Sequence, residues 1–552
     1  MNKKMYAGFL GLFVSLFSLQ TLAQDTLVVS QGWHLRDKAK DNYYGISLDK
    51  AYDFLKSKKL KSSKVVVAVI DGGLDTLHED LRPVMWINSR DIPGNGIDDD
   101  KNGYTDDKFG WNYLGGKNGE SVMTDSDEGH RVYHRFKSKY EGKTVNEKTL
   151  IPAEQIEYRM WKKAEGFIKG AAEGVNIVPI RAAYANITRA DSILAPAIGK
   201  TTYTGHELDS FLPANDAQKK AKEAILGILK RNNAMDASNK DLIGNIKFFL
   251  DDGERKLANV TTPPDDFRKN VTGDDETDFN ARNYGTSDVM AHRSQHGTHV
   301  AGIIGAKRKN GMGVDGVADN VVIMPLIVVP DGDEHDKDIA LGIRYAVDNG
   351  AKIVNMSFGK SFSPGKQWID DAVQYAAKKG VLLVHAAGNE NKNLDAEGME
   401  SYPNPWFLNG KSATNWITVG ASGGGKMGPL AASFSNYGKK NVDVFAPGVS
   451  IYSTITGGNT YEMMQGTSMA APVVSGIAAL IKSYFPSLTP EQIKTAIEKS
   501  VVIPNEKTPV PGADEIQPEV YLKDISKTGG IVNAYNAVKM AYDMSKGAKP
   551  VK

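Results

Sequence analysis

The chain contains short, continuous apolar runs that are rich in β-branched residues. They occur at four places: residues 65–70, 321–329 (interrupted by Met324-Pro325), 353–356 and 381–385. Runs of this length without polar alternation are typical of strands that are buried on both faces of a sheet. Stretches with apolar residues at helical spacing lie between them, such as residues 369–379. Buried strands that alternate with helices predict an α/β fold with a mostly parallel central sheet.

A long interval between these strand-rich regions has a different pattern. Residues 115–283 contain three stretches whose apolar residues each fall on one helix face, and residues 261–278 are rich in Pro and Asp. The three faces consist of Ile156, Met160, Ala164, Phe167 and Ile168; Ala221, Ile225, Ile228 and Leu229; and Leu242, Ile246, Phe249 and Leu250. We therefore expect a mainly helical insertion, which is either a decorated surface loop or a subdomain with a purpose of its own.

Composition narrows the class of protein. The chain has 552 residues, of which 41% are hydrophobic, and its formal net charge at pH 7 is +1. This length exceeds that of one minimal domain, so we expect either several cores or one core with insertions. A net charge near zero gives no reason to expect nucleic acid as a partner. Cysteine is absent, which excludes disulfides, thiolate metal sites and a cysteine nucleophile.

The first 23 residues have the features of a secretory signal peptide. Lys3 and Lys4 precede an apolar run over residues 5–19, and residues 21–23 (TLA) form a small-residue cleavage site. An uncleaved membrane anchor is the alternative, but the run is short for a span and contains serine. We expect an exported protein, periplasmic or extracellular, with no membrane insertion after the signal is removed.

The first candidate catalytic residues along the chain are a carboxylate and a pair of histidines. Asp71 follows the apolar run 65–70 and precedes two glycines, so its carboxylate is placed to accept a hydrogen bond from an imidazole. Acidic residues also end strands in nucleotide-binding folds, so Asp71 alone decides nothing. Residues 296–302 (HGTHVAG) begin a helix rich in small residues. A zinc-protease helix requires four-residue spacing of its histidines and an adjacent Glu, and both are absent here.

Ser468 lies where a loop becomes a helix, within residues 466–472 (GTSMAAP). Pro472 is tolerated in the first turn of a helix, where backbone N–H groups lack intrahelical partners. The N–H of Ser468 is then free and lies at the positive end of the helix dipole, and both features stabilise an oxyanion. A simple N-cap is the alternative for a lone serine, but it does not explain the whole heptapeptide.

Asn389 follows the run 381–385, at the end of residues 385–389 (HAAGN). An amide side chain at the end of a strand can donate a hydrogen bond to a developing oxyanion, together with the N–H of Ser468. In isolation, Gly-Asn is ordinary turn chemistry. Asn389 is therefore a candidate only in combination with the other blocks.

These blocks occur in the chain order Asp71, His296, Ser468, which is one of the known orders of a Ser-His-Asp triad. The chain resembles the subtilisin-like serine protease family (subtilases) over about residues 31–115 and 284–545. The resemblance includes four further segments: residues 313–318, 355–359, 434–438 and 445–448. It implies a three-layer subtilisin-like fold with a triad of Asp71, His296 and Ser468 and an oxyanion hole that includes Asn389. It also implies that His296 is the general base and that His299 is a packed structural histidine.

The same resemblance implies a surface that binds the substrate. A strand edge that pairs with the substrate backbone as an added strand is formed by three residues: Ser357, Phe358 and Gly359. Ser401 occupies a glycine position of the primary specificity pocket and shortens that pocket. Glu390 resembles an acid at the pocket rim, which tolerates polar or basic residues. Gly72 departs from the family pattern, which usually has Ser at this position.

Residues 98–107 (DDDKNGYTDD) are a candidate site for a structural calcium ion. Oxygen ligands alternate and Gly103 is at the sixth position, as in the first half of an EF-hand loop, but the closing Glu is absent. We predict Ca²⁺ bound by four residues: Asp98, Asp100, Asn102 and Asp106. A solvated acidic turn is the alternative. The resemblance implies Asp80 as a second calcium ligand.

The sequence thus predicts the following order: signal peptide (1–23), N-terminal extension (24–60), catalytic domain (61–114 and 284–545) with the helical insertion (115–283), and disordered tail (546–552). We expect a serine endopeptidase that hydrolyses polypeptides through an acyl-enzyme, with no cofactor in the chemistry. The insertion would then bind a partner or restrict substrate access. A peptide ligase with the same triad and a catalytically silent binding protein are the alternatives. The propeptide usual in the family is missing, so we expect maturation by signal removal alone.

Overall fold

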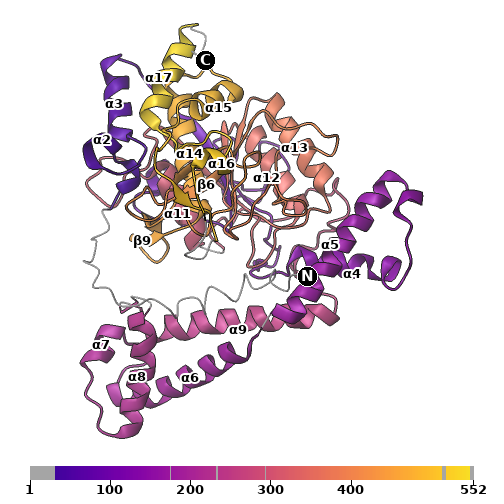
Figure 1. The fold of residues 1–552 in the computed structure, drawn as a ribbon, viewed down its shortest axis with the longest axis vertical. Helices are drawn as coiled ribbons and strands as arrows, with labels where there is room; N and C mark the ends of the chain where they lie inside the picture. The colour runs from indigo at the N-terminus through magenta and orange to yellow at the C-terminus, as the bar shows by residue number, and fades with distance from the viewer. Residues whose placement is uncertain are drawn as a thin grey trace. The chain divides into compact units, whose positions relative to one another are not determined.

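The computed structural model describes residues 31–174, 176–231, 234–235, 237–291, 294–512 and 518–547. The predicted signal peptide and residues 548–552 of the predicted tail lie outside this part of the chain. The chain divides into two compact units (Figure 1): a smaller one over Gly129–Asp265, and a larger one that combines Ala23–Glu128 with Asp266–Lys552. Within the described residues, no helix combines the length and the apolarity that a membrane span requires.

The larger unit is built on a seven-stranded sheet with the order β2-β3-β1-β4-β5-β6-β7, and every neighbouring pair is parallel. The strands are β1 (Val65–Asp71), β2 (Trp111–Asn112), β3 (Val321–Ile327), β4 (Ile353–Met356), β5 (Leu382–Ala386), β6 (Trp416–Ser422) and β7 (Val444–Pro447). The four apolar runs of the sequence form β1, β3, β4 and β5. The prediction of an α/β fold with a parallel central sheet is confirmed.

Helices cover both faces of this sheet, because successive residues of each strand point to opposite sides. Val67 and Val69 belong to a core with α11 (Gln295–Gly305) and α14 (Thr467–Tyr484). Ala68 and Ile70 belong to a second core with α12 (Asp336–Asp348) and α13 (Lys366–Lys378). The result is the three-layer arrangement that the sequence predicts.

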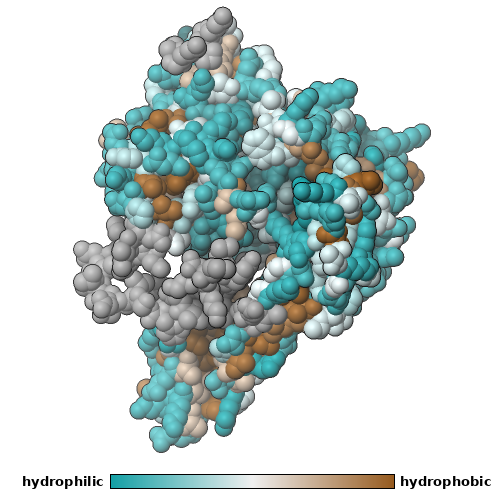
Figure 2. Space-filling model, turned by 45° about the vertical axis from the view of Figure 1, so that its right-hand side comes forward, coloured by the Kyte–Doolittle hydropathy of each residue, from teal (hydrophilic) through white to brown (hydrophobic). Residues whose placement is uncertain are grey.

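Shorter elements complete the larger unit. Two hairpins are formed by β8 (Ile451–Ile455) with β9 (Thr460–Met464) and by β10 (Thr508–Pro509) with β11 (Glu519–Val520). The remaining helices are η2 (Trp33–Leu35), α2 (Lys38–Asp41), α3 (Leu48–Ser57), η3 (Arg82–Val84), α10 (Phe267–Thr272), α15 (Pro490–Glu498), α16 (Leu522–Ile525) and α17 (Ala534–Ser545). On the face shown in Figure 2, the surface is mostly hydrophilic, with scattered apolar residues.

The segment predicted as an N-terminal extension packs into the main core. Leu48, Ala51 and Leu55 of α3 are buried in the same core as β1, and α3 packs against α17. The indole N–H of Trp33 donates to the carbonyl of Val449 at 3.0 Å. Because α3 repeats apolar residues on one face, it closes this core, and the structure has no domain boundary at residue 60.

In its described residues, the smaller unit contains helices and no strand, apart from an isolated bridge between Thr204 and Ser238. Its helices are α4 (Glu128–Tyr140, whose first residue belongs to the larger unit), η4 (Glu147–Thr149), α5 (Pro152–Gly174), α6 (Val178–Ile198), α7 (Gly205–Ser210), α8 (Asp216–Arg231) and α9 (Asn239–Thr261). Ala221, Ile225 and Leu229 of α8 are buried in its core, as their spacing predicts. Ile156 and Phe249 were expected on buried faces but are 46% and 47% exposed. Residues four apart on a helix differ in direction by about 40°. Over several such steps along the predicted face, Ile156 therefore points away from the side of α5 that is buried.

The smaller unit is shorter than the predicted insertion 115–283. Residues 115–128 and 266–283 belong to the larger unit instead. Val122 is buried beside Ile327 of β3, and Phe267 packs against the same cluster. Arg268 donates two hydrogen bonds to Asp338 of α12, at 2.8 and 2.7 Å. Apolar packing and this buried ion pair explain why both connecting segments stay with the sheet.

Candidate active site

Asp71 and His296 meet at the carboxyl end of the sheet. Asp71 is the last residue of β1, and only 3% of it is exposed. Nδ1 of His296 lies 3.0 Å from both carboxylate oxygens of Asp71, and the N–H of Gly72 donates to Oδ1 at 2.7 Å. These contacts leave Nε2 of His296 as the ring nitrogen available for proton transfer.

Glycines bring α11 close enough for this contact. His296 is the second residue of α11, whose N-cap Ser294 accepts a hydrogen bond from the N–H of Gly297. A Cβ at Gly297 would lie 2.1 Å from the carbonyl oxygen of Gly73 and 3.0 Å from Oδ1 of Asp71. Any larger residue would push the helix, and the imidazole with it, away from β1.

The electrostatics of His296 reflect two opposing effects. Burial by itself lowers the pKa of the imidazole, because it disfavours the charged form. The negative charge of Asp71 and its hydrogen bond raise the pKa, and together they outweigh burial, so the net shift is upward from 6.5. The imidazolium is therefore stabilised in place.

Ser468 is the second residue of α14 and is partly exposed. Its hydroxyl donates to the carbonyl oxygen of Ser357 at 3.1 Å, and the hydroxyl of Ser357 donates back to the carbonyl oxygen of Ser468 at 3.0 Å. Among the described residues, no hydrogen bond joins the Ser468 hydroxyl to Nε2 of His296. Catalytic hydrogen bonds are often formed only when substrate is bound, and rotation about the Cα–Cβ bond of Ser468 redirects this hydroxyl.

Asn389 lies close to the start of α14, where Ser468 is. Oδ1 of Asn389 accepts hydrogen bonds from the N–H and the hydroxyl of Thr467, at 2.8 and 3.0 Å. This fixes the amide, so that Nδ2 is the free end. A Cβ built on Gly466 would lie 3.5 Å from the Ser468 nitrogen and 3.6 Å from Nδ2 of Asn389. The first N–H groups of a helix have no intrahelical acceptor, so the N–H of Ser468 is near the free Nδ2 of Asn389 at the start of α14.

His299 has a structural environment. It is fully buried, and its Nε2 contacts the carbonyl oxygens of Ile451 at 2.9 Å and Glu462 at 3.1 Å. Burial lowers the pKa of His299 to about 4, so the ring is neutral at physiological pH. Its side chain bonds β8 and β9 rather than facing Ser468.

Comparison with known proteins identifies the family. A model described as "Subtilase family" matches residues 62–518. The chain belongs to this family. It is similar to the "Thermophilic serine proteinase" of Bacillus sp. (strain AK1), with 38% identity over 263 residues that cover 47% of this chain and 55% of the relative. It is also similar to the "Thermostable alkaline protease" of Halalkalibacterium halodurans, with 38% identity over 206 residues that cover 37% and 52% of the two chains.

The chain spans about half the length of these two relatives. A solved protease structure from Pseudoalteromonas arctica is similar at a TM-score of 0.42 and 20% identity, over 92% of this chain and 96% of that one.

In this subtilase, the expected substrate edge follows β4. Ser357 is buried, Phe358 is half-buried and Gly359 is exposed. Lys360, the next residue, pairs with Tyr402 through two backbone hydrogen bonds of 2.9 and 2.8 Å. The backbone of Gly359 is therefore accessible beside a segment that includes Ser401, whose Oγ would lie 3.1 Å from a Cβ at Gly359.

Glu390 is exposed, but its carboxylate is engaged. Oε2 accepts a hydrogen bond from Nδ2 of Asn436 at 2.6 Å, while Oδ1 of Asn436 accepts from the N–H groups of Glu390 and Lys392. The structure thus holds Glu390 against Asn436.

The carboxylates predicted as calcium ligands of the subtilase have partners within the protein. The carboxylate of Asp106 accepts N–H groups of residues 94–96, and that of Asp98 accepts those of Asn102 and Gly103. Asp100 contacts Arg90 at 3.2 Å, although its Oδ1 is buried without a partner. Within the described residues, no group of three or more His, Asp or Glu side chains could hold a metal ion. Calcium binding by residues 98–107 stays a prediction.

Asp80 has protein partners as well. Its Oδ2 accepts hydrogen bonds from the N–H of Val314 at 3.0 Å and from the hydroxyl of Tyr461 at 2.9 Å, and its Oδ1 accepts from Nδ2 of Asn310 at 2.5 Å. It joins the loop after α11 to β9. Asp80 thus connects two segments that are far apart in the sequence through hydrogen bonds.

Sequence reasoning missed a chain of hydrogen bonds that supports Ser468. The hydroxyl of Ser475 in α14 donates to Oδ1 of Asn355 at 2.8 Å, and Nδ2 of Asn355 donates to the Ser357 hydroxyl at 2.9 Å. Ser357 in turn binds the Ser468 carbonyl. One feature of the sequence could have revealed this network: Asn355 is a polar residue inside the apolar run 353–356, and buried polar groups require partners.

Proposed function

We propose that this subtilase is a serine endopeptidase with Ser468 as nucleophile, His296 as general base and Asp71 as the residue that orients the imidazole. The observation that carries the proposal is the contact of His296 Nδ1 with both carboxylate oxygens of Asp71 at 3.0 Å. This contact selects the tautomer in which Nε2 can accept a proton. The protease names of the relatives support the same activity.

The proposed reaction proceeds through an acyl-enzyme. The Ser468 oxygen attacks the carbonyl carbon of the scissile peptide while Nε2 of His296 takes the hydroxyl proton. The Ser468 N–H and Nδ2 of Asn389 then stabilise the oxyanion, and a donor of this kind is worth about 10²–10³ in turnover. His296 returns its proton to the leaving amine, and water hydrolyses the ester by the same route. This chemistry uses no metal or cofactor.

Labelling with a fluorophosphonate probe tests the proposal. We expect a single adduct on Ser468 by peptide mass mapping, and we expect His296→Ala to lose the label because the hydroxyl is no longer activated. Ser468→Ala is the matched control for probe specificity. Absence of label on folded wild-type protein would contradict the proposal. Masses of peptide products distinguish hydrolysis from ligation, because a ligated product lacks the added water.

We further propose that the protein is exported. The support is the charged and apolar N-terminal segment with its cleavage site at residues 21–23. N-terminal sequencing of protein recovered from outside the cytoplasm should begin at Gln24. A start at Met1 in that material would contradict cleavage.

A further inference from the structure

The backbone that follows β4 reaches the proposed nucleophile. The carbonyl oxygen of Ser357 accepts from the Ser468 hydroxyl at 3.1 Å, and Gly359, two residues later, is exposed. A peptide that binds as an added strand needs an accessible backbone of this kind, because main-chain hydrogen bonds provide its affinity. Residues 357–359, which we call the substrate edge, belong to no helix or strand. Contacts at the two ends of the edge must therefore fix its position.

The two ends of the substrate edge are held in different ways. Next to β4, the hydroxyl of Ser357 donates to the carbonyl oxygen of Ser468 at 3.0 Å and accepts from Nδ2 of Asn355 at 2.9 Å. At the opposite end, the N–H and the carbonyl of Lys360 pair with the backbone of Tyr402 at 2.9 and 2.8 Å. Lys360 is thus the residue at which the edge is attached to the neighbouring segment.

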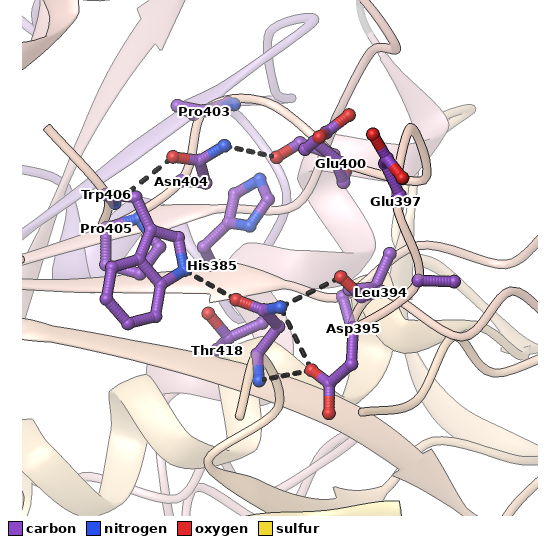
Figure 3. A pocket seen from close by; sticks show the side chains of 14 residues that line it. His385, Leu394, Asp395, Glu397, Glu400, Pro403, Asn404, Pro405, Trp406 and Thr418 are labelled. Carbon is purple, nitrogen blue, oxygen red and sulfur yellow. Dashed lines mark hydrogen bonds between the residues drawn. The ribbon is translucent and has the colours of Figure 1, made fainter. Parts of the chain in front are cut away.

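A pocket of about 220 Å³ lies beside Gly359 (Figure 3). It is lined by Ser401 and Pro403, which are the two neighbours of Tyr402 in the chain. Oγ of Ser401 would lie 3.1 Å from a Cβ at Gly359. Through its pairing with Tyr402, Lys360 therefore affects the wall of this pocket as well as the substrate edge.

The side chain of Lys360 is completely buried, which is rare for a lysine unless its charge is paired. Nζ donates to Oε2 of Glu128 at 3.0 Å and to the carbonyl oxygen of Glu334 at 2.6 Å, and it lies 3.1 Å from Oδ1 of Asp336. Glu128 and Asp336 are themselves buried. Because desolvation offsets most of the attraction, a buried ion pair of this kind adds little net stability. Its main physical effect is to fix where the lysine lies.

Asp336 also holds the loop that leads away from the edge. Besides contacting Lys360, its carboxylate accepts from the hydroxyl of Ser363 at 3.0 Å and from the N–H of Gly365 at 2.7 Å. Asp336 is the first residue of α12, and Glu128 is the first residue of α4. A negative charge is favourable at both positions, because the N-terminus is the positive end of a helix dipole. Since α12 packs on β1 and β3, Asp336 connects the edge to the sheet.

We propose that Lys360 is a positioning residue, whose buried ammonium group holds the substrate edge in place through Asp336 and Glu128. The inference rests on the proposed endopeptidase function and concerns how the same site binds an extended peptide. The ammonium group contacts Glu128, Glu334 and Asp336 rather than Ser468, so it acts on peptide binding and not on proton transfer. It should matter for substrates that lie along the edge, and not for substrates too short to reach it.

Two synthetic substrates test this inference. Both are anilides with the same residue before the scissile bond, but one has four residues before that bond and the other has only that residue, N-acetylated. Lys360→Met keeps most of the length of the side chain and removes its charge. We expect the ratio of kcat/KM, long substrate over short, to fall about tenfold, mainly through KM, because small displacements of positioning groups are costly. Fluorophosphonate titration of Ser468 gives the concentration of active sites.

Lys337→Met is the matched control. The side chain of Lys337 in α12 is as completely buried as that of Lys360, but its ammonium group binds Asp274 at 2.7 Å and the carbonyl oxygen of Asp275 at 2.9 Å. We expect this variant to be less stable and to keep the wild-type ratio. A fall as large as that in Lys360→Met would show that the ratio follows general destabilisation, and would overturn the inference.

Glu128→Gln decides the case in which Lys360→Met does not fold. It keeps a side-chain oxygen beside Nζ and removes one negative charge, so we expect a smaller fall of the ratio. An unchanged ratio in every folded variant at these two positions, or equal cleavage of both substrates by the wild type, overturns the inference while labelling of Ser468 still supports the endopeptidase. Absence of both labelling and cleavage in the wild type overturns the inference together with the proposed function.

Discussion

At the scale of single residues, the candidate site is organised by groups that are fixed at one atom and free at the other. Asp71 holds Nδ1 of His296, which leaves Nε2, and Thr467 holds Oδ1 of Asn389, which leaves Nδ2. Groups oriented before the substrate arrives need no reorganisation during the reaction. The fixed orientations of His296 and Asn389 lead to two testable expectations.

The first concerns the pH dependence of activity. His296, the proposed general base, must be neutral to accept a proton, and Asp71 raises its pKa from 6.5 despite burial. Protonation therefore removes the base at a higher pH than for a free imidazole, and the acid limb of kcat/KM should have its midpoint above pH 6.5. In Asp71→Asn, the residual activity should show a midpoint at lower pH. Rates from pH 5 to 9 on a peptide without titratable groups provide the measurement, and a wild-type midpoint at or below 6.5 would contradict this account.

The second prediction concerns Gly466, which has a φ of +151°. Its Cβ position lies 3.5 Å from the Ser468 nitrogen and 3.6 Å from Nδ2 of Asn389. Gly466→Ala should therefore obstruct the oxyanion and lower kcat by about 10²-fold, the loss typical of one donor. Gly458→Ala shares the positive φ, at +86°, but meets no atom within 4 Å. Equal kcat values for the two variants in steady-state assays would exclude a role for the position of Gly466.

At the scale of elements, close packing of helices on the sheet places the reacting groups. Gly297 lets α11 approach β1, and a Cβ at Gly476 of α14 would lie 2.5 Å from Cβ of Val317. α14 carries Ser468 at its start and Ser475 one layer deeper, where Ser475 binds Asn355 of β4. Ser468, the proposed nucleophile, is thus fixed to the sheet through its own helix and through β4.

The third prediction tests whether α3 is part of this framework. Leu55 is 1% exposed in the core shared by α3, β1 and α17. Leu55→Ala should lower the free energy of unfolding by about 2–5 kcal/mol, as for other buried leucines. Asp53→Ala, at an exposed position of the same helix, should change it by less than about 0.5 kcal/mol. Denaturant unfolding measures both, and equal stability of the two variants would mean that α3 is dispensable.

At the scale of the whole molecule, a buried ionic cluster holds the returning segment 266–284 within the larger unit. Arg268 is 1% exposed and contacts both Asp338 and Asp274 at 2.7 Å, and Lys337 binds Asp274 at 2.7 Å. The hydroxyl of Tyr284 donates to Asp338 at 2.5 Å. Buried charges require such complete pairing because their desolvation is costly.

The fourth prediction follows from this cluster. Arg268→Met leaves two carboxylates with a buried charge that is no longer balanced, and should destabilise the larger unit by about 3–5 kcal/mol. Arg90→Met is the comparison, since Arg90 is 57% exposed in its pair with Asp100 and should change stability by about 0–1 kcal/mol. Thermal unfolding at matched pH separates the two, and an equally small effect of both variants would refute the structural importance of Arg268.

The sequence by itself determined four of the seven strands of the sheet and pointed to the residues proposed for the active site. The strands β1, β3, β4 and β5 were predictable because continuous apolar runs between helical stretches have few other stable arrangements. Asp71, His296, Ser468 and Asn389 became candidates because their segments occur in an order along the chain that resembles the subtilase family, whereas each segment alone has a simpler explanation. The helical nature of residues 129–265 was visible in the spacing of Ala221, Ile225 and Leu229.

The tertiary structure alone decided what depends on distant contacts. Asn355 and Ser475 are far apart in the sequence, and the pocket beside Gly359 combines residues from 385 to 441. In the acidic loop, the spacing of residues 98–107 predicted calcium ligands, whereas only the folded structure shows that backbone N–H groups and Arg90 contact these carboxylates. Local patterns specify which side chains are near an element's end, whereas partners, burial and free atoms follow only from how the elements pack.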